Sequence, residues 1–180
     1  MHRVLLFTSL VAFFAARSGF AAVQSVSNPP SQEHMTHEIR NELITLPQLS
    51  IFDNLAFKLE GGTVTLIGQV RNAVLKDSAE KVVKDIDGVR EVNNKIDVLP
   101  PSRNDDRIRK AVARAIFNDD RLFRYSMGAV PPIHIIVKGG HVSLEGIVAN
   151  QADKDAAGLR ANGVPGVFSV QNNLRLESTT

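Results

Sequence analysis

The sequence predicts an α+β protein made of two tandem copies of one module, each in the order helix, strand, strand, helix, strand. Residues 61–70 reappear as residues 139–148, which offsets the two copies by 78 residues. In each copy a Gly-Gly pair separates two runs of alternating apolar and polar residues, a pattern typical of a β-hairpin. Apolar residues at intervals of three or four on both sides of the hairpin indicate amphipathic helices.

The offset continues without a gap beyond the hairpin, as expected when a repeated unit sets the architecture. The matching pairs include Asn72 and Asn150, Gly88 and Gly166, Val92 and Val170, and Asn94 and Asn172. So many matches in one register predict that both copies have the same fold.

Copy one is expected to occupy residues 36–99, and its first helix follows a candidate cap, Thr36. Gly61 and Gly62 then form the turn between two short strands, because glycine adopts positive φ at little steric cost. The apolar face of the first helix is expected to consist of Ile39, Leu43 and Leu46.

The second helix of copy one follows Asn72, a favourable cap residue, and is expected to end at Gly88. Residues 89–98 then supply the last strand, with apolar residues at even spacing. The buried face of this helix is expected to comprise Leu75, Ala79, Val82, Val83 and Ile86.

Copy two is expected to occupy residues 102–177 and to differ from copy one. Ser102 caps its first helix, with Asp105 as an acidic partner three residues on. Nine additional residues separate that helix from its hairpin, in a segment that includes residues 123–132. The second helix is expected to be weaker, because three of its residues oppose helix: Gly158, Gly163 and Pro165.

Eight glycines are predicted to serve as structural turn residues, four in each copy. They are Gly61, Gly62, Gly68 and Gly88, with Gly139, Gly140, Gly146 and Gly166. The double glycines do not resemble phosphate-binding loops, because they lead into a strand and not into a helix.

The first thirty residues differ in character from the rest of the chain. Residues 1–22 have a basic start, an apolar run and then small residues, the pattern of a cleavable secretory signal peptide. A flexible polar tail is expected over residues 23–35. The chain contains no cysteine, which excludes disulfides, thiolate chemistry and a lipid-anchoring cysteine. The expected location is therefore the periplasm, without a lipid anchor.

Both copies also carry two motifs at one spacing. Val-x-Leu-x-Gly-x-Val occupies residues 64–70 and 142–148, and Gly-Val-x-x-Val-x-Asn occupies residues 88–94 and 166–172. This pattern resembles the BON domain of bacterial periplasmic proteins of the osmotically inducible and nodulation-linked types. The resemblance covers residues 36–176.

The resemblance implies a three-stranded mixed sheet with two helices on one face in each module. It also implies a protein that binds phospholipid and supports envelope integrity or osmotic stress tolerance, with chaperone-like activity as an alternative. The matching residues are mainly turn glycines and core positions. They therefore transfer a fold more securely than a ligand site.

Charge is unevenly divided between the two copies. Residues 36–100 carry 8 Lys/Arg against 10 Asp/Glu, whereas residues 101–180 carry 11 against 8. In the first helix of copy two, four basic residues fall at spacings of 4, 3 and 4, which places them on one helix face: Arg103, Arg107, Lys110 and Arg114. A basic face attracts an anionic lipid surface. The alternative is an ordinary solvated helix surface, with Asp105 and Asp106 partly compensating the charge.

The inserted segment of copy two alternates basic and aromatic residues at Phe123, Arg124 and Tyr125. Such side chains suit a lipid headgroup interface, and they equally suit packing between the two modules. The predicted lipid-binding residues are therefore Arg107, Lys110, Arg114, Phe123, Arg124 and Tyr125.

Other site chemistries find little support. His34 and His37 have no third ligand nearby, and no metal or cofactor is expected. No nucleophile motif or carboxylate pair indicates catalysis, and an exported protein is not expected to meet nucleic acid. The sequence thus predicts a non-enzymatic periplasmic protein that binds anionic phospholipid through copy two, with copy one mainly structural. The alternative is a chaperone or interaction module for other envelope proteins, which would use the free edges of its sheets.

Overall fold

The computed structural model describes residues 31–128 and 131–177, so the expected signal peptide lies outside this range. The chain forms two domains, which we call domain 1 (residues 31–99) and domain 2 (residues 102–177). The elements of domain 1 are α1 (Gln32–Ile44), β1 (Asn54–Glu60), β2 (Thr63–Val70), α2 (Ala73–Lys84), β3 (Glu91–Asn94) and β4 (Asp97–Val98). Those of domain 2 are α3 (Arg103–Phe117), the 3-10 helix η1 (Phe123–Ser126), β5 (Ile133–Lys138), β6 (His141–Val148), α4 (Gln151–Asn162), β7 (Ser169–Asn172) and β8 (Arg175–Leu176).

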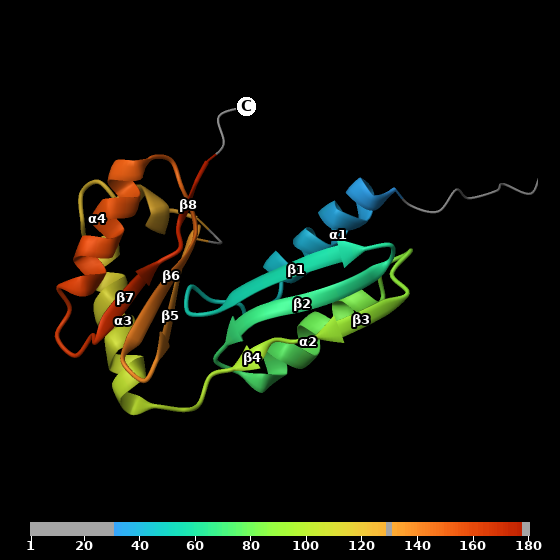
Figure 1. Ribbon diagram of the computed structural model, residues 1–180, viewed down its shortest axis with the longest axis horizontal. Helices are drawn as coiled ribbons and strands as arrows, with labels where there is room; N and C mark the ends of the chain where they lie inside the picture. The colour runs from blue at the N-terminus through green and yellow to red at the C-terminus, as the bar shows by residue number, and fades with distance from the viewer. Residues whose placement is uncertain (1–30, 129–130, 178–180) are drawn as a thin grey trace, which may run out of the picture.

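Each domain contains one mixed sheet with two α-helices packed on one face (Figure 1). In domain 1, β2 is the central strand, antiparallel to β1 and parallel to both β3 and β4. Domain 2 repeats this arrangement around β6. The predicted fold class and the predicted tandem modules are confirmed.

The third strand of each sheet is divided into two pieces because a buried residue interrupts it. Between β3 and β4 the chain turns inward, and Ile96 enters the core with 2% of its surface exposed. The Asn94 Oδ1 atom accepts a hydrogen bond from the Ile96 N–H at 3.2 Å and stabilises this turn. Leu174 and Asn172 form the same turn in domain 2, with a distance of 3.3 Å.

The core of each domain lies between its helices and the covered face of its sheet. Helical periodicity predicts these positions well. The predicted residues of domain 1 that are buried are Ile39, Leu43, Leu46, Leu75, Ala79, Val83 and Ile86, and the same periodicity in α3 buries Ile108, Val112 and Ile116 of domain 2. Val82 and Ala115 are partly buried at the margins of the two cores.

The first helix begins earlier than the sequence predicts. Ser31 is the N-cap of α1, and its hydroxyl accepts a hydrogen bond from the His34 N–H at 3.2 Å. Thr36 lies inside the helix, where its hydroxyl donates to the Gln32 carbonyl oxygen at 2.7 Å. The helix extends back because Met35 packs into the core and is only 8% exposed. The expected flexible tail therefore does not include residues 31–35, and its remainder lies outside the described residues.

The second helices of the two domains have the same length, 12 residues each. α2 ends at Lys84, so Gly88 belongs to the loop that follows and not to the helix end. Within α4, Gly158 serves packing: a Cβ there would lie 2.8 Å from the Asn172 side-chain nitrogen. That nitrogen donates to the Lys154 carbonyl oxygen at 2.7 Å, which ties α4 to β7.

All eight predicted turn glycines have positive φ. Gly68 and Gly146 lie inside β2 and β6 and not in turns, with φ of +123° and +119°. At each of them a Cβ would collide with a backbone carbonyl oxygen of the neighbouring chain segment, that of Asn54 or Pro132. Both glycines therefore allow a close backbone approach at the start of the hairpin.

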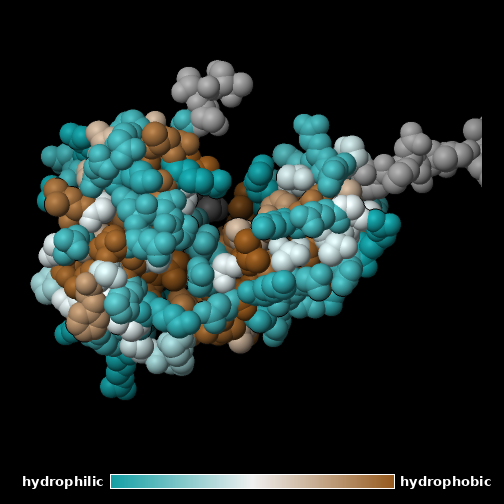
Figure 2. All heavy atoms as spheres, in the orientation of Figure 1, coloured by the Kyte–Doolittle hydropathy of each residue, from teal (hydrophilic) through white to brown (hydrophobic). Residues whose placement is uncertain are grey.

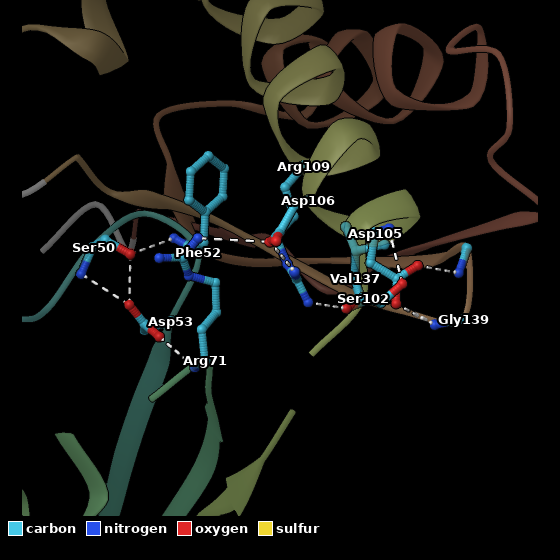
Figure 3. Close-up of polar contacts among 11 residues, drawn as sticks. Ser50, Phe52, Asp53, Arg71, Ser102, Asp105, Asp106, Arg109, Val137 and Gly139 are labelled. Carbon is cyan, nitrogen blue, oxygen red and sulfur yellow. Dashed lines mark hydrogen bonds and ion pairs between the residues drawn. The ribbon is translucent and has the colours of Figure 1, made fainter. Parts of the chain in front are cut away.

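The two domains meet at a joint beside the starts of β1 and β5 (Figures 1 and 3). The Ile135 N–H donates to the Ile51 carbonyl oxygen at 2.7 Å. The Arg71 guanidinium lies over the Phe52 ring, 5.4 Å from its centroid, and 3.8 Å from the Asp106 carboxylate. Because β1 and β5 are edge strands, the sheets touch edge to edge and then diverge.

His134 lies in β5 at this joint, where its side chain is partly buried. Burial lowers the pKa of His134 below its ordinary value of 6.5, although the nearby backbone of Asp53 and Ser50 partly opposes the shift. Among the described residues its Nδ1 atom has no hydrogen-bond partner. The folded state therefore favours the neutral ring, and this contribution to stability is complete above pH 6.5.

We expect the free energy of unfolding to fall as the pH drops from 6.5 toward the lower folded-state pKa. Urea unfolding of the wild type, His134→Gln and His37→Gln on both sides of pH 6.5 would measure this. His134→Gln should show a smaller loss on acidification, whereas the exposed control His37→Gln should behave as the wild type. An unchanged pH dependence in His134→Gln would contradict this assignment.

Candidate membrane-binding surface

A row of basic side chains lies along the exposed face of α3. Arg107, Lys110 and Arg114 are all exposed. The Arg107 guanidinium donates to the Asn104 side-chain oxygen at 2.8 Å. In the described part of the chain, none of these three cations forms an ion pair within 4.0 Å.

The acidic residues of the same helix are turned away from this row. Asp105 is 2% exposed, and its carboxylate accepts hydrogen bonds from the N–H groups of Gly139 and Gly140, each at 2.9 Å (Figure 3). Asp106 pairs with Arg109 at 2.7 Å and lies near Arg71. Asp105 and Asp106 were expected to compensate the basic charge of α3, but their carboxylates bind the hairpin and the domain joint. They therefore do not neutralise the exposed cations on the outer face of the helix.

An apolar groove of about 410 Å³ runs beside this row, between α3 and the end of α4. Two large apolar side chains of domain 2 are exposed: Leu159, which lines the groove, is 73% exposed, and Phe168, which lies on Gly140 of the hairpin, is 75% exposed. Figure 2 shows apolar surface interspersed with hydrophilic surface on domain 2. The apolar residues that line the groove are Ala111, Ala115, Leu159, Val164 and Pro165.

Leu159 and Phe168 were not predicted as surface residues of interest, although comparison of the two copies of the repeat distinguishes them. At the offset of 78 residues, their counterparts in domain 1 are Lys81 and Arg90. Two surface cations of one copy are thus apolar in the other. Phe168 lies on Gly140, where a Cβ would be 2.6 Å from its ring, just as Arg90 lies on the first hairpin.

The inserted segment corrects part of the predicted site. Tyr125 is only 9% exposed, and its hydroxyl donates to Asp153 at 2.6 Å and accepts from the Ala149 N–H at 2.8 Å. Tyr125 was predicted as a lipid contact, but this ring is part of the domain 2 core and is not included in the candidate surface. Phe123 is 55% exposed, in η1 beyond the end of α3.

Arg124 has a structural role within domain 2. It forms an ion pair with the buried Asp153, and its guanidinium lies 4.9 Å from the centroid of the Tyr125 ring. Hydrogen bonding to the Tyr125 hydroxyl, and then to Asp153, raises the pKa of Arg124 above its ordinary value. Its charge is thus partly neutralised by Asp153, and Arg124 differs from the three unpaired cations of α3.

Within residues 31–128 and 131–177, no cluster of three or more His, Cys, Asp or Glu side chains is arranged to hold a metal ion. Over the same residues, no helix has both the length and the apolar character needed to span a bilayer.

The chain belongs to the BON domain family, since the BON domain matches residues 33–100 and 104–178. Among curated relatives, the chain is 27% identical to the osmotically-inducible protein Y of Escherichia coli over 164 residues, covering 86% of this chain and 77% of that protein. It is 32% identical to the outer membrane lipoprotein DolP of Haemophilus influenzae over 114 residues, covering 61% of this chain and 55% of that protein. The chain thus spans about half the length of DolP.

Among solved structures, the chain is matched to the C-terminal domain of CdsD, a structural protein of the type III secretion system of Chlamydia trachomatis. That domain is 15% identical to this chain, with a TM-score of 0.32, and the match covers 83% of this chain and 100% of the CdsD domain. At this level the similarity carries no functional conclusion.

Proposed function

We propose that this chain is a non-enzymatic periplasmic envelope protein whose second domain binds the surface of anionic phospholipid membranes. The proposed binding surface consists of Arg107, Lys110 and Arg114 on α3, with Leu159 in the neighbouring groove and the exposed Phe168 on the hairpin of the same domain. The relatives support an envelope or osmotic-stress setting, because one is an osmotically inducible protein and another an outer membrane lipoprotein. The proposed role is to support envelope integrity or osmotic stress tolerance.

One observation carries this proposal: three exposed cations without ion-pair partners among the described residues lie along α3, beside a groove that includes the exposed Leu159. Exposed apolar side chains beside a basic helix face suit a lipid headgroup interface. The buried positions of Asp105 and the pairing of Asp106 with Arg109 support it, because they leave the outer face of α3 basic.

The two kinds of side chain would act at different distances from the membrane. The cations attract an anionic surface, with about 1 kcal/mol per basic residue close to it, and this attraction weakens as salt shortens the Debye length. Leu159 and the Phe168 ring then gain burial among the headgroups, which does not depend on salt in the same way. Binding should therefore be reduced, but not abolished, by moderate salt.

We expect the triple variant Arg107→Glu, Lys110→Glu, Arg114→Glu to bind anionic vesicles about 100-fold more weakly at low salt, because about 1 kcal/mol is lost for each cation. Vesicle sedimentation with phosphatidylglycerol-containing vesicles measures the affinity. Leu159→Ser should weaken binding at every salt concentration. Phosphatidylcholine vesicles provide the neutral comparison.

A matched control is the triple variant Lys58→Glu, Lys81→Glu, Lys95→Glu, which changes the net charge equally on exposed residues of domain 1. It should retain affinity within a fewfold of the wild type. Equal losses in both triple variants would show that only net charge matters and would contradict a site on α3. Absence of any binding to anionic vesicles at low salt would refute the lipid function itself.

A further inference from the structure

The outer edge of β1 presents backbone groups that do not face its neighbour in the sheet. The Leu59 carbonyl oxygen accepts a hydrogen bond from the Gln32 side chain at 3.3 Å and thus points away from β2. Because successive residues of a strand alternate in the direction of their backbone groups, Leu55 and Phe57 also point outward. Asn54 has the opposite orientation, since its carbonyl oxygen lies against Gly68 in β2.

The equivalent edge of domain 2 is closed. The Val137 carbonyl oxygen, the counterpart of Leu59 at the repeat offset, accepts a hydrogen bond from the buried Arg109 at 2.5 Å. Two residues earlier, the Ile135 N–H is bonded to domain 1 at the joint. Two of the outward-facing positions of β5, Ile135 and Val137, are therefore occupied within the chain.

Arg40 illustrates why the β1 edge differs. It follows Ile39 in α1 as Arg109 follows Ile108 in α3, but Arg109 is 3% exposed and Arg40 is exposed. Among the described residues, Arg40 has no ion-pair partner and does not cover the strand edge. The arginine at this helix position is thus buried against the strand edge in domain 2 and exposed to solvent in domain 1.

A groove of about 580 Å³ lies along this edge, between α1 and β1. Its walls are mainly apolar and include Leu43, Ile44 and Phe57. Two arginines border it: Arg40 from α1, and Arg175, which extends from β8 of domain 2. An open strand edge, an apolar wall and two cations therefore converge at one place, on the side of β1 that faces the opening between the domains (Figure 1).

We propose that this β1 edge binds an extended protein segment that carries a carboxylate side chain, by addition of a strand to the domain 1 sheet. The backbone of Leu55 and Phe57 would continue the hydrogen-bond ladder, and the groove would hold apolar side chains of the segment. Arg40 and Arg175 would bind the carboxylate with charge-assisted hydrogen bonds. This surface is separate from the lipid-binding surface proposed for domain 2.

The domain joint supports a strand as the occupant. The Ile51 carbonyl oxygen already accepts a hydrogen bond from an edge strand of domain 2, so an added segment would continue a contact that the chain itself begins. Charge complementarity selects the class of segment, because both cations at the groove are arginines, whose planar donors match a carboxylate.

Fluorescence anisotropy with the full chain tests the proposal. The probe is a labelled peptide of alternating valine and threonine with one central glutamate, and its twin carries glutamine at that place. We expect the glutamate peptide to bind about tenfold more tightly than the twin, in keeping with a charge-assisted contact. Arg40→Glu with Arg175→Glu should remove this difference, whereas the exposed control Lys95→Glu should preserve it.

Two measurements test the strand addition itself. Phe57→Pro removes an outward N–H and should weaken both peptides, since proline is tolerated at strand edges. Amide hydrogen exchange of Leu55 and Phe57 in the wild type should slow when peptide is present, which does not depend on any variant folding.

Failure of both peptides to bind, or exchange at Leu55 and Phe57 that peptide does not slow, would overturn the proposal. The proposal would also be overturned if the Arg40 and Arg175 double variant lost vesicle binding but bound peptides normally. That result would show that this edge binds lipid and not a protein segment. The α3 triple variant separates the two functions, since it should lose vesicle binding and keep peptide binding.

Discussion

Replacing Gly146 with alanine should lower the free energy of unfolding of domain 2 by on the order of 3 kcal/mol or more, the sum expected from backbone strain and overpacking. Gly146 has φ of +119°, a conformation that side chains rarely allow. The added Cβ would also collide with the Pro132 carbonyl oxygen, which is backbone and has little freedom to move. The hairpin would have to open to relieve the contact.

Gly139→Ala is the matched control for this substitution, in the turn of the same hairpin. Gly139 has φ of +61° and no atom within 4 Å of the place a Cβ would occupy. It should cost only about 1 kcal/mol, the penalty of the left-handed conformation alone. Urea unfolding followed by circular dichroism measures both variants, and similar losses for the two would contradict the steric explanation.

Asp53→Ala should destabilise domain 1 by about 3 kcal/mol, because it removes a buried, hydrogen-bonded charge and leaves its donors unpaired. Asp53 is 2% exposed. Its carboxylate accepts hydrogen bonds from the Ser50 N–H at 3.1 Å, the Ser50 hydroxyl at 2.5 Å and the Arg71 N–H at 2.7 Å (Figure 3). These bonds fix the loop that enters β1 against the segment that follows β2.

The same loop carries Ile51 and Phe52, so this variant should also loosen the domain joint. Chemical unfolding gives the stability, and limited proteolysis of the folded chain reports the opening of the loop. Asp87→Ala, at an exposed carboxylate of the same domain, should stay within about 0.5 kcal/mol of the wild type. A loss in Asp53→Ala no larger than in this control would show that the carboxylate is not needed.

The sequence predicts the fold well because its signals are local and occur twice. Gly61 with Gly62 and Gly139 with Gly140 mark the hairpins, and the apolar periodicity marks the buried helix faces. The start of the first helix is harder to predict from the sequence, because Ser31 and Thr36 are both good cap residues. The choice between them depends on the burial of Met35 in the core, which is a tertiary effect.

The candidate site was less predictable, for a related reason. A basic and aromatic segment indicates an interface, but the pattern does not show that Tyr125 reaches Asp153, which lies 28 residues away in the sequence. Likewise, helical spacing alone does not reveal that Asp105 is held by the hairpin N–H groups. Comparison of the two copies is the better guide, since Leu159 and Phe168 replace cations of domain 1.

The divided third strand of each sheet limits how copies of this protein can assemble. Proteins with long free strand edges on two sides can join head to tail into fibres. Here the outer edge opposite β1 or β5 consists of a four-residue and a two-residue piece, separated by the inward turn of Ile96 or Leu174. In the described part of the chain, β1 is thus the longest strand with an open edge, and its pairing with the β1 edge of a second copy would form a closed, symmetric dimer. Contacts between strand edges would therefore end at a dimer and would not continue into a fibre.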